Sequence, residues 1–97
     1  MIKLGKMTSP GKDIHDEIRF ALENDFDFVE IGIEMPALFY FKRQNKKILE
    51  SLKAFVNPPI GHTTWWYDLG SIFESVRKGW IQQARNDMRT ADSLGIS

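Results

Sequence analysis

Apolar and polar residues alternate along the chain with two different spacings, which predict three strands that each precede a helix. Short runs rich in β-forming residues occupy residues 2–7, residues 28–33 and the segment through Ile60 and His62. After each run, apolar residues recur every three or four positions, as on one face of a helix. This order predicts an α/β fold with a parallel sheet and right-handed crossovers.

Turn and capping residues predict the limits of the first two helices. Asp13 is a suitable N-cap for the first helix, and the Asn-Asp pair at residues 24–25 is expected to end it. Pro36 interrupts the chain after the second strand, because proline cannot donate a backbone hydrogen bond. The second helix is therefore predicted over residues 42–55.

The third helix is predicted to begin at Ser71, because Glu74 three residues later completes a capping box. Gly95 is typical of the residue just past a helix, where the backbone turns left-handed. Between them runs an apolar stripe that we expect to pack on the sheet, formed by Ile72, Phe73, Val76, Trp80, Ala84, Met88, Ala91 and Leu94.

Composition narrows the class of protein. The 97 residues suffice for a single domain over 1–97, and 42% of them are apolar. Thirteen basic residues balance 13 acidic ones, so we expect no nucleic-acid partner. The chain has no cysteine, no apolar run of membrane-spanning length and no signal-peptide pattern, so we expect a cytoplasmic protein without a membrane partner.

Two glutamates on the second strand are candidate catalytic residues. Because successive side chains of a strand point to opposite faces, Val29, Ile31 and Ile33 share the face that helices should cover. Glu30 and Glu34 share the opposite face. Burying an unpaired carboxylate is costly, so a glutamate placed inward near the carboxyl end of a strand usually serves function.

Both glutamates also have a simpler interpretation. Glu30 could form an ion pair with a basic residue such as Lys3 or Lys6. Glu34 lies already at the loop, where a functional and a purely structural role are equally open.

The segment after the third strand adds further candidates. His62 could act as a metal ligand or a proton shuttle, or its ring could simply be satisfied by a backbone carbonyl. Trp65 and Trp66 could form a wall on which a sugar ring stacks, or a hydrophobic lid or subunit contact. Thr8, at the end of the first strand, could line the same mouth and bind substrate.

Several segments resemble the xylose isomerase-like barrel superfamily. Residues 21–31 read ALENDFDFVEI, which is similar to the helix and second strand of that family. Residues 61–66 read GHTTWW and look like its third strand, which ends in a histidine. Residues 68–71, with Glu74, and residues 91–96 resemble the helix that follows. Asp25 departs from the pattern, since the family usually has glycine there.

The resemblance implies a partial (βα)8 barrel, because it covers three of eight units and a full barrel needs about 250 residues. The superfamily includes sugar-phosphate isomerases and epimerases and apurinic-site endonucleases. It favours Glu30 as a functional carboxylate and His62 as a metal ligand. In the sugar branch a divalent metal is held mainly by residues of later strands, so we expect this chain to bind none stably.

Two classes of function follow. The first is the N-terminal part of a metal-dependent sugar-phosphate isomerase or epimerase, inactive until a complementary barrel fragment or self-assembly completes it. The second is a non-catalytic oligomer, because a three-stranded parallel sheet leaves two edges and one face open for pairing with copies of itself. Whether the chain alone is an enzyme stays open. An endonuclease-like fragment is a weaker alternative because the chain carries no net charge.

Overall fold

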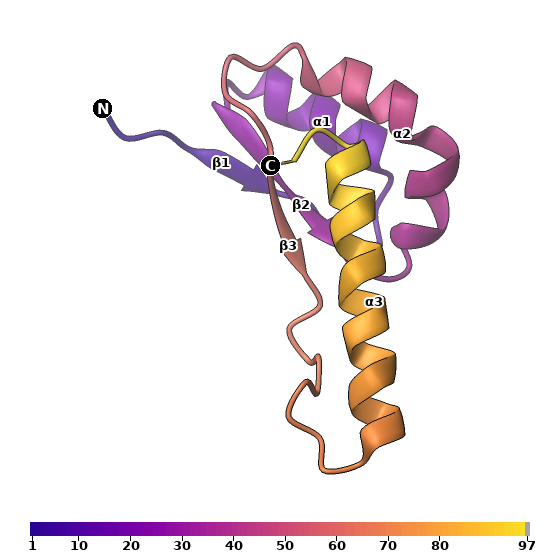
Figure 1. The fold of residues 1–97 in the computed structure, drawn as a ribbon. Coiled ribbons are helices and arrows are strands. Elements are labelled where there is room, and N and C mark those ends of the chain that lie inside the picture. The colour runs from indigo at the N-terminus through magenta and orange to yellow at the C-terminus, as the bar shows by residue number, and fades with distance from the viewer. Residues whose placement is uncertain (97) are drawn as a thin grey trace.

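A computed structural model describes residues 1–96 and shows one parallel sheet with three helices (Figure 1). The strands pair in the order β1-β2-β3, so β2 is central. The predicted α/β fold of three βα units is confirmed. The elements are β1 (Gly5–Met7), α1 (Ile14–Glu23), β2 (Phe28–Ile33), α2 (Leu38–Leu52), β3 (Ile60–Thr63) and α3 (Glu74–Ser93).

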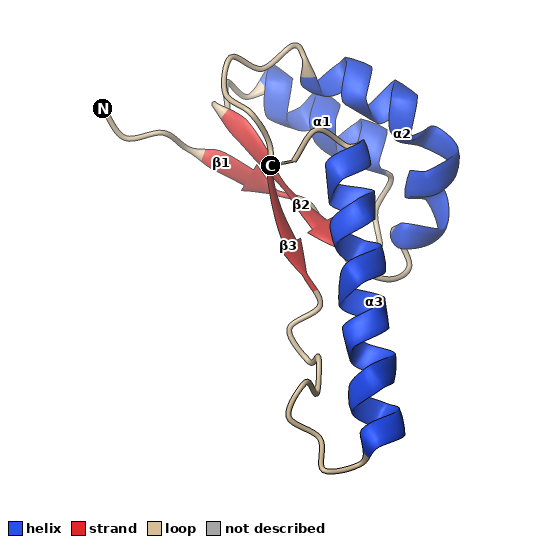
Figure 2. Ribbon diagram, viewed as in Figure 1, coloured by secondary structure: helices blue, strands red, loops and turns tan. Residues whose placement is uncertain are grey.

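All three helices lie on the same side of the sheet (Figure 2). Val29, Ile31 and Ile33 point to that side and are fully buried, as the alternation of β2 predicts. The core between sheet and helices is apolar and continuous, which makes its burial the main stabilising contribution. Its other members are Ile14, Ile18, Ala21, Ala37, Phe41, Ile48, Leu52 and Leu94.

The opposite face of the sheet carries no helix. Register pairs Met7 with Glu30 and Gly32 with His62, and residues paired in this way share a face. Met7 and Ile60 are more than half exposed on this open face. The candidate functional side chains therefore lie on a different face from the core.

Helix α1 is capped at both ends by local sequence. The Asp13 carboxylate accepts hydrogen bonds from the backbone N–H groups of His15 and Asp16, as predicted. At the other end, Asp25 has a φ of 57°, and the Phe26 N–H reaches the carbonyl of Ala21. This is the hydrogen-bond pattern of a Schellman motif, with aspartate where glycine is usual.

Helix α3 ends in the same motif, with the glycine that the sequence predicts. Gly95 has a φ of 76°, and the Ile96 N–H donates to the carbonyl of Ala91. A Cβ at Gly95 would lie 2.8 Å from Cδ1 of Leu49, so packing against α2 also favours glycine there.

The first strand is shorter than predicted. Only Gly5–Met7 is paired, in register with β2 from Phe28 onward. The Leu4 N–H donates to the side-chain carboxylate of Asp27, and the Leu4 carbonyl accepts from the Asp27 N–H, just before β2 begins. Residues 1–4 therefore have no strand beside them, and apolar Ile2 stays exposed.

The second helix begins four residues before the predicted start and ends three residues before the predicted end. Pro36 precedes its first turn, where a missing N–H costs nothing, so proline does not delay the helix. Phe41 faces the core from this early part, about two turns before Ile48. After Leu52 the chain continues in tight turns with i→i+3 hydrogen bonds, which mimic helical spacing in the sequence.

The predicted start of the third helix is also wrong. Phe73 precedes the first helical residue, Glu74, and donates its backbone N–H to the Ser71 hydroxyl. Ser71 therefore stabilises the turn before α3, and the expected capping box is not formed. Although α3 is 20 residues long, no helix within residues 1–96 is apolar enough over sufficient length to cross a bilayer.

The apolar stripe of α3 meets the core only near the carboxyl end of the helix. Leu94 is fully buried and Ala91 packs against the core. Phe73 and Met88 are about two-thirds exposed, and Val76 is 42% exposed. The amino-terminal half of α3 extends past the sheet beside the β3–α3 loop (Figure 1), so its side chains find no strand beneath them.

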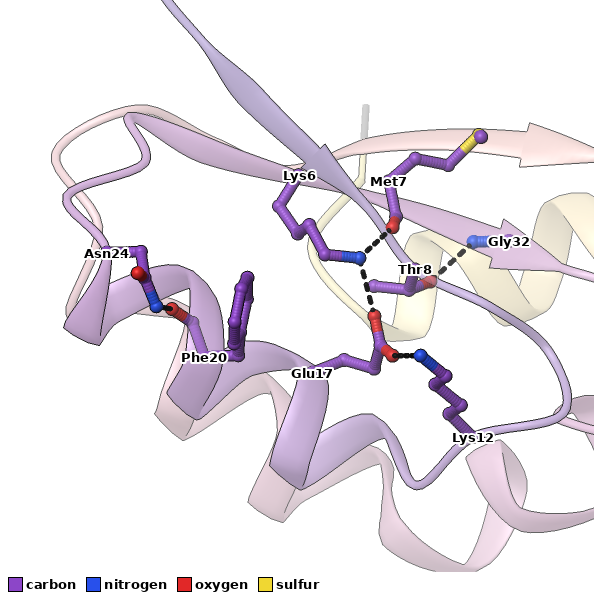
Figure 3. Close-up of polar contacts among 8 residues, drawn as sticks. All are labelled: Lys6, Met7, Thr8, Lys12, Glu17, Phe20, Asn24 and Gly32. Carbon is purple, nitrogen blue, oxygen red and sulfur yellow. Dashed lines mark hydrogen bonds and ion pairs between the residues drawn. The ribbon is translucent and has the colours of Figure 1, made fainter.

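A buried carboxylate ties α1 to β1 (Figure 3). Glu17 is 6% exposed, and its Oε2 lies 2.9 Å from Nζ of Lys6. Lys12 approaches the other carboxylate oxygen at 3.9 Å. The Lys6 ammonium also lies 5.9 Å from the centre of the Phe20 ring. Two cations thus offset the cost of burying the Glu17 charge.

Candidate functional site

The candidate residues gather at the carboxyl ends of the three strands. Thr8 follows β1, Glu34 follows β2, and His62 lies in β3 next to its end. Parallel strands present these ends at one edge of the sheet, which is where α/β proteins bind their ligands.

The imidazole of His62 lies between two carboxylates. Its Nδ1 is 3.1 Å from Oε1 of Glu30, and its Nε2 is 3.6 Å from Oε2 of Glu34. Because an ionised carboxylate only accepts hydrogen bonds, Nδ1 carries the hydrogen of the shorter contact. The second distance exceeds that of a direct hydrogen bond, and the contact is an ion pair only when the ring is protonated. Glu30 is 39% exposed and Glu34 is 14% exposed.

The simpler interpretation of Glu30 does not match the geometry. Lys6 pairs with Glu17 on the helix side of the sheet. Lys3 donates to the side-chain oxygen of Asn57. The side chain in contact with Glu30 is the imidazole of His62, from the neighbouring strand.

Gly32 leaves the space that the histidine ring occupies. A Cβ at this residue would lie 3.2 Å from Nε2 of His62 and 3.6 Å from the carbonyl oxygen of Thr8. The Gly32 N–H donates to the Thr8 hydroxyl at 3.1 Å. Thr8 is 5% exposed, so in this structure its side chain joins β1 to β2 and offers little surface to a ligand.

The two tryptophans lie just after β3. Trp65 is 86% exposed and Trp66 is half exposed. Their rings meet edge to face, with centres 5.5 Å apart and planes at 89°. Such a pair presents a flat aromatic face to solvent near the carboxyl edge, as both a sugar wall and a protein contact require.

A second polar contact holds the loop that carries these tryptophans. The Tyr67 hydroxyl donates to the carboxylate of Asp87, which is 1% exposed and also accepts from Gln83 at 2.8 Å. Burial raises the pKa of Tyr67 to about 12, and the Asp87 carboxylate adds to the rise through its hydrogen bond and its charge. The hydroxyls of Thr63 and Thr64 oppose part of that effect.

The resemblance implies a divalent metal, which requires side-chain ligands at the site. Nε2 of His62 and the Glu34 carboxylate could both reach one ion placed between them, with Glu30 holding the other ring nitrogen. Two protein ligands are fewer than zinc or calcium sites normally supply. Within residues 1–96, no three His, Asp or Glu side chains are grouped to hold an ion. Within the described residues, these side chains therefore do not make a complete zinc or calcium site.

Sequence reasoning missed Gly32 and Asp87. Gly32 lies between Glu30 and Glu34 on the same face of β2, so the alternation already marks it as a neighbour of the site. Asp87 is an acidic residue within the apolar stripe of α3, and a charge on such a stripe signals a buried partner. The partner, Tyr67, is 20 residues away and has no signal of its own.

Chemically, the site can accept, hold and return one proton. Two carboxylates and one imidazole supply both the base and the group that passes the proton on.

Comparison of the chain with known protein families and with curated proteins finds no match.

Proposed function

We propose that this chain forms the first three βα units of a xylose isomerase-like barrel and carries the proton-transfer part of a sugar-phosphate isomerase or epimerase site. The proposal rests on one observation: His62 lies between Glu30 and Glu34 at the carboxyl edge of a parallel sheet. It also draws on the sequence resemblance, which covers Glu30 and His62.

The face on which these residues lie supports the proposal. Glu30, Gly32 and His62 belong to the open face of the sheet, whereas the core fills the other face. In a closed barrel the helices lie outside and the opposite face turns inward. Further βα units would therefore enclose the site from the side that is open here.

The reaction requires transfer of a proton from one carbon to its neighbour, or from one face of a carbon to the other. In aldose–ketose isomerisation and in epimerisation, a base removes the proton beside a carbonyl, and the C–H electron pair becomes the double bond of an enediolate. In isomerisation a proton then returns to the neighbouring carbon while the hydroxyl proton passes from one enediolate oxygen to the other, and in epimerisation a proton returns to the opposite face of the same carbon. A positioned carboxylate or imidazole suits this task.

We assign the base to Glu34, the less exposed of the two carboxylates. Glu30 accepts the Nδ1 hydrogen of His62, which fixes the ring. A neutral ring held in this way directs the lone pair of Nε2 toward Glu34. His62 can then take the proton from the carboxylate and return it. Trp65 and Trp66 would supply the stacking face for the sugar.

The isolated chain is expected to bind a sugar phosphate weakly without turning it over. Stabilising an enediolate needs fixed positive charge or hydrogen-bond donors aimed at its oxygens. The groups that would supply them, including the remaining ligands of a divalent metal, belong to units beyond the three described. A complementary fragment of the barrel is the partner that this function requires.

Binding can be tested by NMR of the full chain, which has two histidines and three tryptophans. Fructose 6-phosphate and ribulose 5-phosphate are added while the imidazole Cε1–H and indole N–H signals are followed, and His62→Asn assigns the site histidine. The expected result is a saturable shift of the His62 signals, with His15 as the internal control.

Two further measurements separate the sugar from its phosphate and the site from the surface. Inorganic phosphate should leave the His62 signals unchanged. Glu34→Gln should weaken the sugar-phosphate response, whereas Glu50→Gln, on the exposed face of α2, should not. Absence of any His62 shift up to about 20 mM ligand, where even weak binding is measurable, would overturn the proposal.

A further inference from the structure

The β3–α3 loop and the start of α3 form an exposed apolar surface, named here the apolar arm. It extends beyond the end of the sheet (Figure 1). Trp65 and Ile72 are 86% and 89% exposed, values unusual for large apolar side chains. The members of the arm are Trp65, Trp66, Leu69, Ile72, Phe73 and Val76.

The loop part of this surface carries little charge, whereas Glu74 and Lys78 are exposed at the start of α3. Between His62 and Glu74 the chain contains one charged residue, Asp68. Enrichment in aromatic residues and depletion of charge distinguish the centre of a protein interface from ordinary surface. The composition of the arm therefore fits a protein contact.

The arm is held in shape before any partner binds. Tyr67 hydrogen-bonds Asp87 of α3, and its ring lies 5.4 Å from the ring of Trp80. Arg77 donates to the backbone carbonyl of Ser71 at 3.1 Å. A surface already ordered loses little conformational entropy on association.

The size of the arm suits a dimer. Six exposed side chains at about 100–150 Å² each present roughly 600–900 Å² per chain. The largest apolar patch of a typical monomer is about 300–600 Å², and a stable interface buries about 800 Å² on each partner. The net charge of the chain is zero, so two copies approach without long-range repulsion.

We propose that the apolar arms of two copies of this chain pack on each other in a symmetric dimer. A two-fold interface needs one self-complementary patch, which each copy supplies. The inference shares Trp65 and Trp66 with the proposed sugar site, but it uses neither Glu30 nor His62 and centres on the outer end of the loop and helix.

The test is the solution mass of the full chain by sedimentation equilibrium, from about 5 to about 200 µM. The expected result is a reversible increase from the 11.3 kDa chain mass to twice that value. A single species at the monomer mass over the whole range would overturn the proposal. Polydisperse aggregates that never settle at twice the chain mass would also overturn it.

A matched pair of variants locates the interface. Ile72→Lys places a charge in the arm, and Val56→Lys makes the same change at another exposed β-branched residue, 98% exposed and outside the arm. We expect Ile72→Lys to weaken dimerisation at least about tenfold and Val56→Lys to leave it unchanged. Equal effects of the two variants would place the contact elsewhere and refute the assignment. Circular dichroism shows whether each variant keeps the fold.

The dimer and the sugar site can fail separately. The ligand titration reports on the His62 ring, and the sedimentation experiment reports on mass. Ile72→Lys should bind sugar phosphate as the unmodified chain does, because Ile72 lies outside the His62 site. A monomeric chain that still binds sugar phosphate would refute only the dimer.

Discussion

A methyl group at Gly32 would lie 3.2 Å from Nε2 of His62, so the missing side chain of one strand makes room for the imidazole ring of the next. This distance is tighter than ordinary van der Waals contact, and the ring would have to move by a few tenths of an ångström. The ring is 30% exposed and can move outward.

Gly32→Ala is therefore expected to displace His62 with little effect on the fold. The free energy of unfolding should change by no more than about 1 kcal/mol, because alanine also lowers the entropy of the unfolded chain. The imidazole NMR signals of His62 should shift, since its contacts with Glu30 and Glu34 change. Gly79→Ala, at a helical site with no atom within 4 Å, is the control and should leave these signals in place.

Asp25→Gly should stabilise the protein by about 0.5–1 kcal/mol, measured by urea unfolding. Asp25 holds a φ of 57°, which is unfavourable for residues with a Cβ and free of strain for glycine. Its side chain is exposed, so little is lost on its removal. Asp25→Ala keeps the Cβ, and alanine adopts a positive φ less readily than aspartate, so this variant should lower the free energy of unfolding. A higher stability with alanine would contradict the explanation.

Lys6→Met should lower the free energy of unfolding by about 2 kcal/mol. The change leaves the buried Glu17 carboxylate with only the distant, exposed Lys12 beside it. Arg19→Met removes a pair with Asp16 in which both side chains are well exposed, and should cost less than about 0.5 kcal/mol.

A double variant separates charge from packing in the same cluster. Lys6→Met combined with Glu17→Leu should recover part of the loss, because no unpaired charge stays buried. Chemical denaturation of the four proteins of this cycle provides the coupling energy. Simple additivity of the two changes would mean that the ion pair does not account for the loss.

Ionisation of Tyr67 should make stability fall at alkaline pH. Its pKa of about 12 in the folded chain exceeds the ordinary value of 10.0, so folding favours the neutral phenol. This contribution is complete below pH 10 and is lost as the pH rises from 10 through 12. Urea unfolding at successive pH values should show that the free energy of unfolding of the unmodified chain falls as the pH rises. The fall should be smaller for Tyr67→Phe, which has no hydroxyl to ionise.

Absorbance at 295 nm gives a direct check in a Tyr40→Phe background, where Tyr67 is the one tyrosine left. The midpoint should lie near 12, and Asp87→Asn should lower it by removing the neighbouring negative charge. A midpoint at 10.0 in the folded protein would show that the hydroxyl is not held by Asp87.

The layout of the fold could be predicted because local patterns and long-range packing agree. The alternation of Val29, Ile31 and Ile33 reflects a strand covered on one face, and the structure places β2 at the predicted residues. The ends of helices and strands that were predicted wrongly depend on strand pairing or on turn geometry. The length of β1 is set by where β2 begins, and the extent of the core beneath α3 is set by the length of β3.

The candidate site could be predicted in part for the same reason. Parallel strands bring their carboxyl ends together, so Glu30, Glu34 and His62 were expected near one edge, and the structure places them in contact. The register of β2 with β3 decides which nitrogen of His62 faces which carboxylate. That register cannot be read from a single sequence. The contact of Tyr67 with Asp87 depends on how the loop folds back on α3.

Within residues 29–34, alternate side chains point to opposite faces of the sheet and have different roles. Residues 29, 31 and 33 contribute to the core, whereas residues 30, 32 and 34 belong to the proposed site and are not core members. In a deep mutational scan of residues 29–34, substitutions at the odd-numbered positions should therefore lower the abundance of folded protein. Substitutions at the even-numbered positions should instead weaken sugar-phosphate binding. An evolving protein could in this way change its chemistry without first acquiring spare stability.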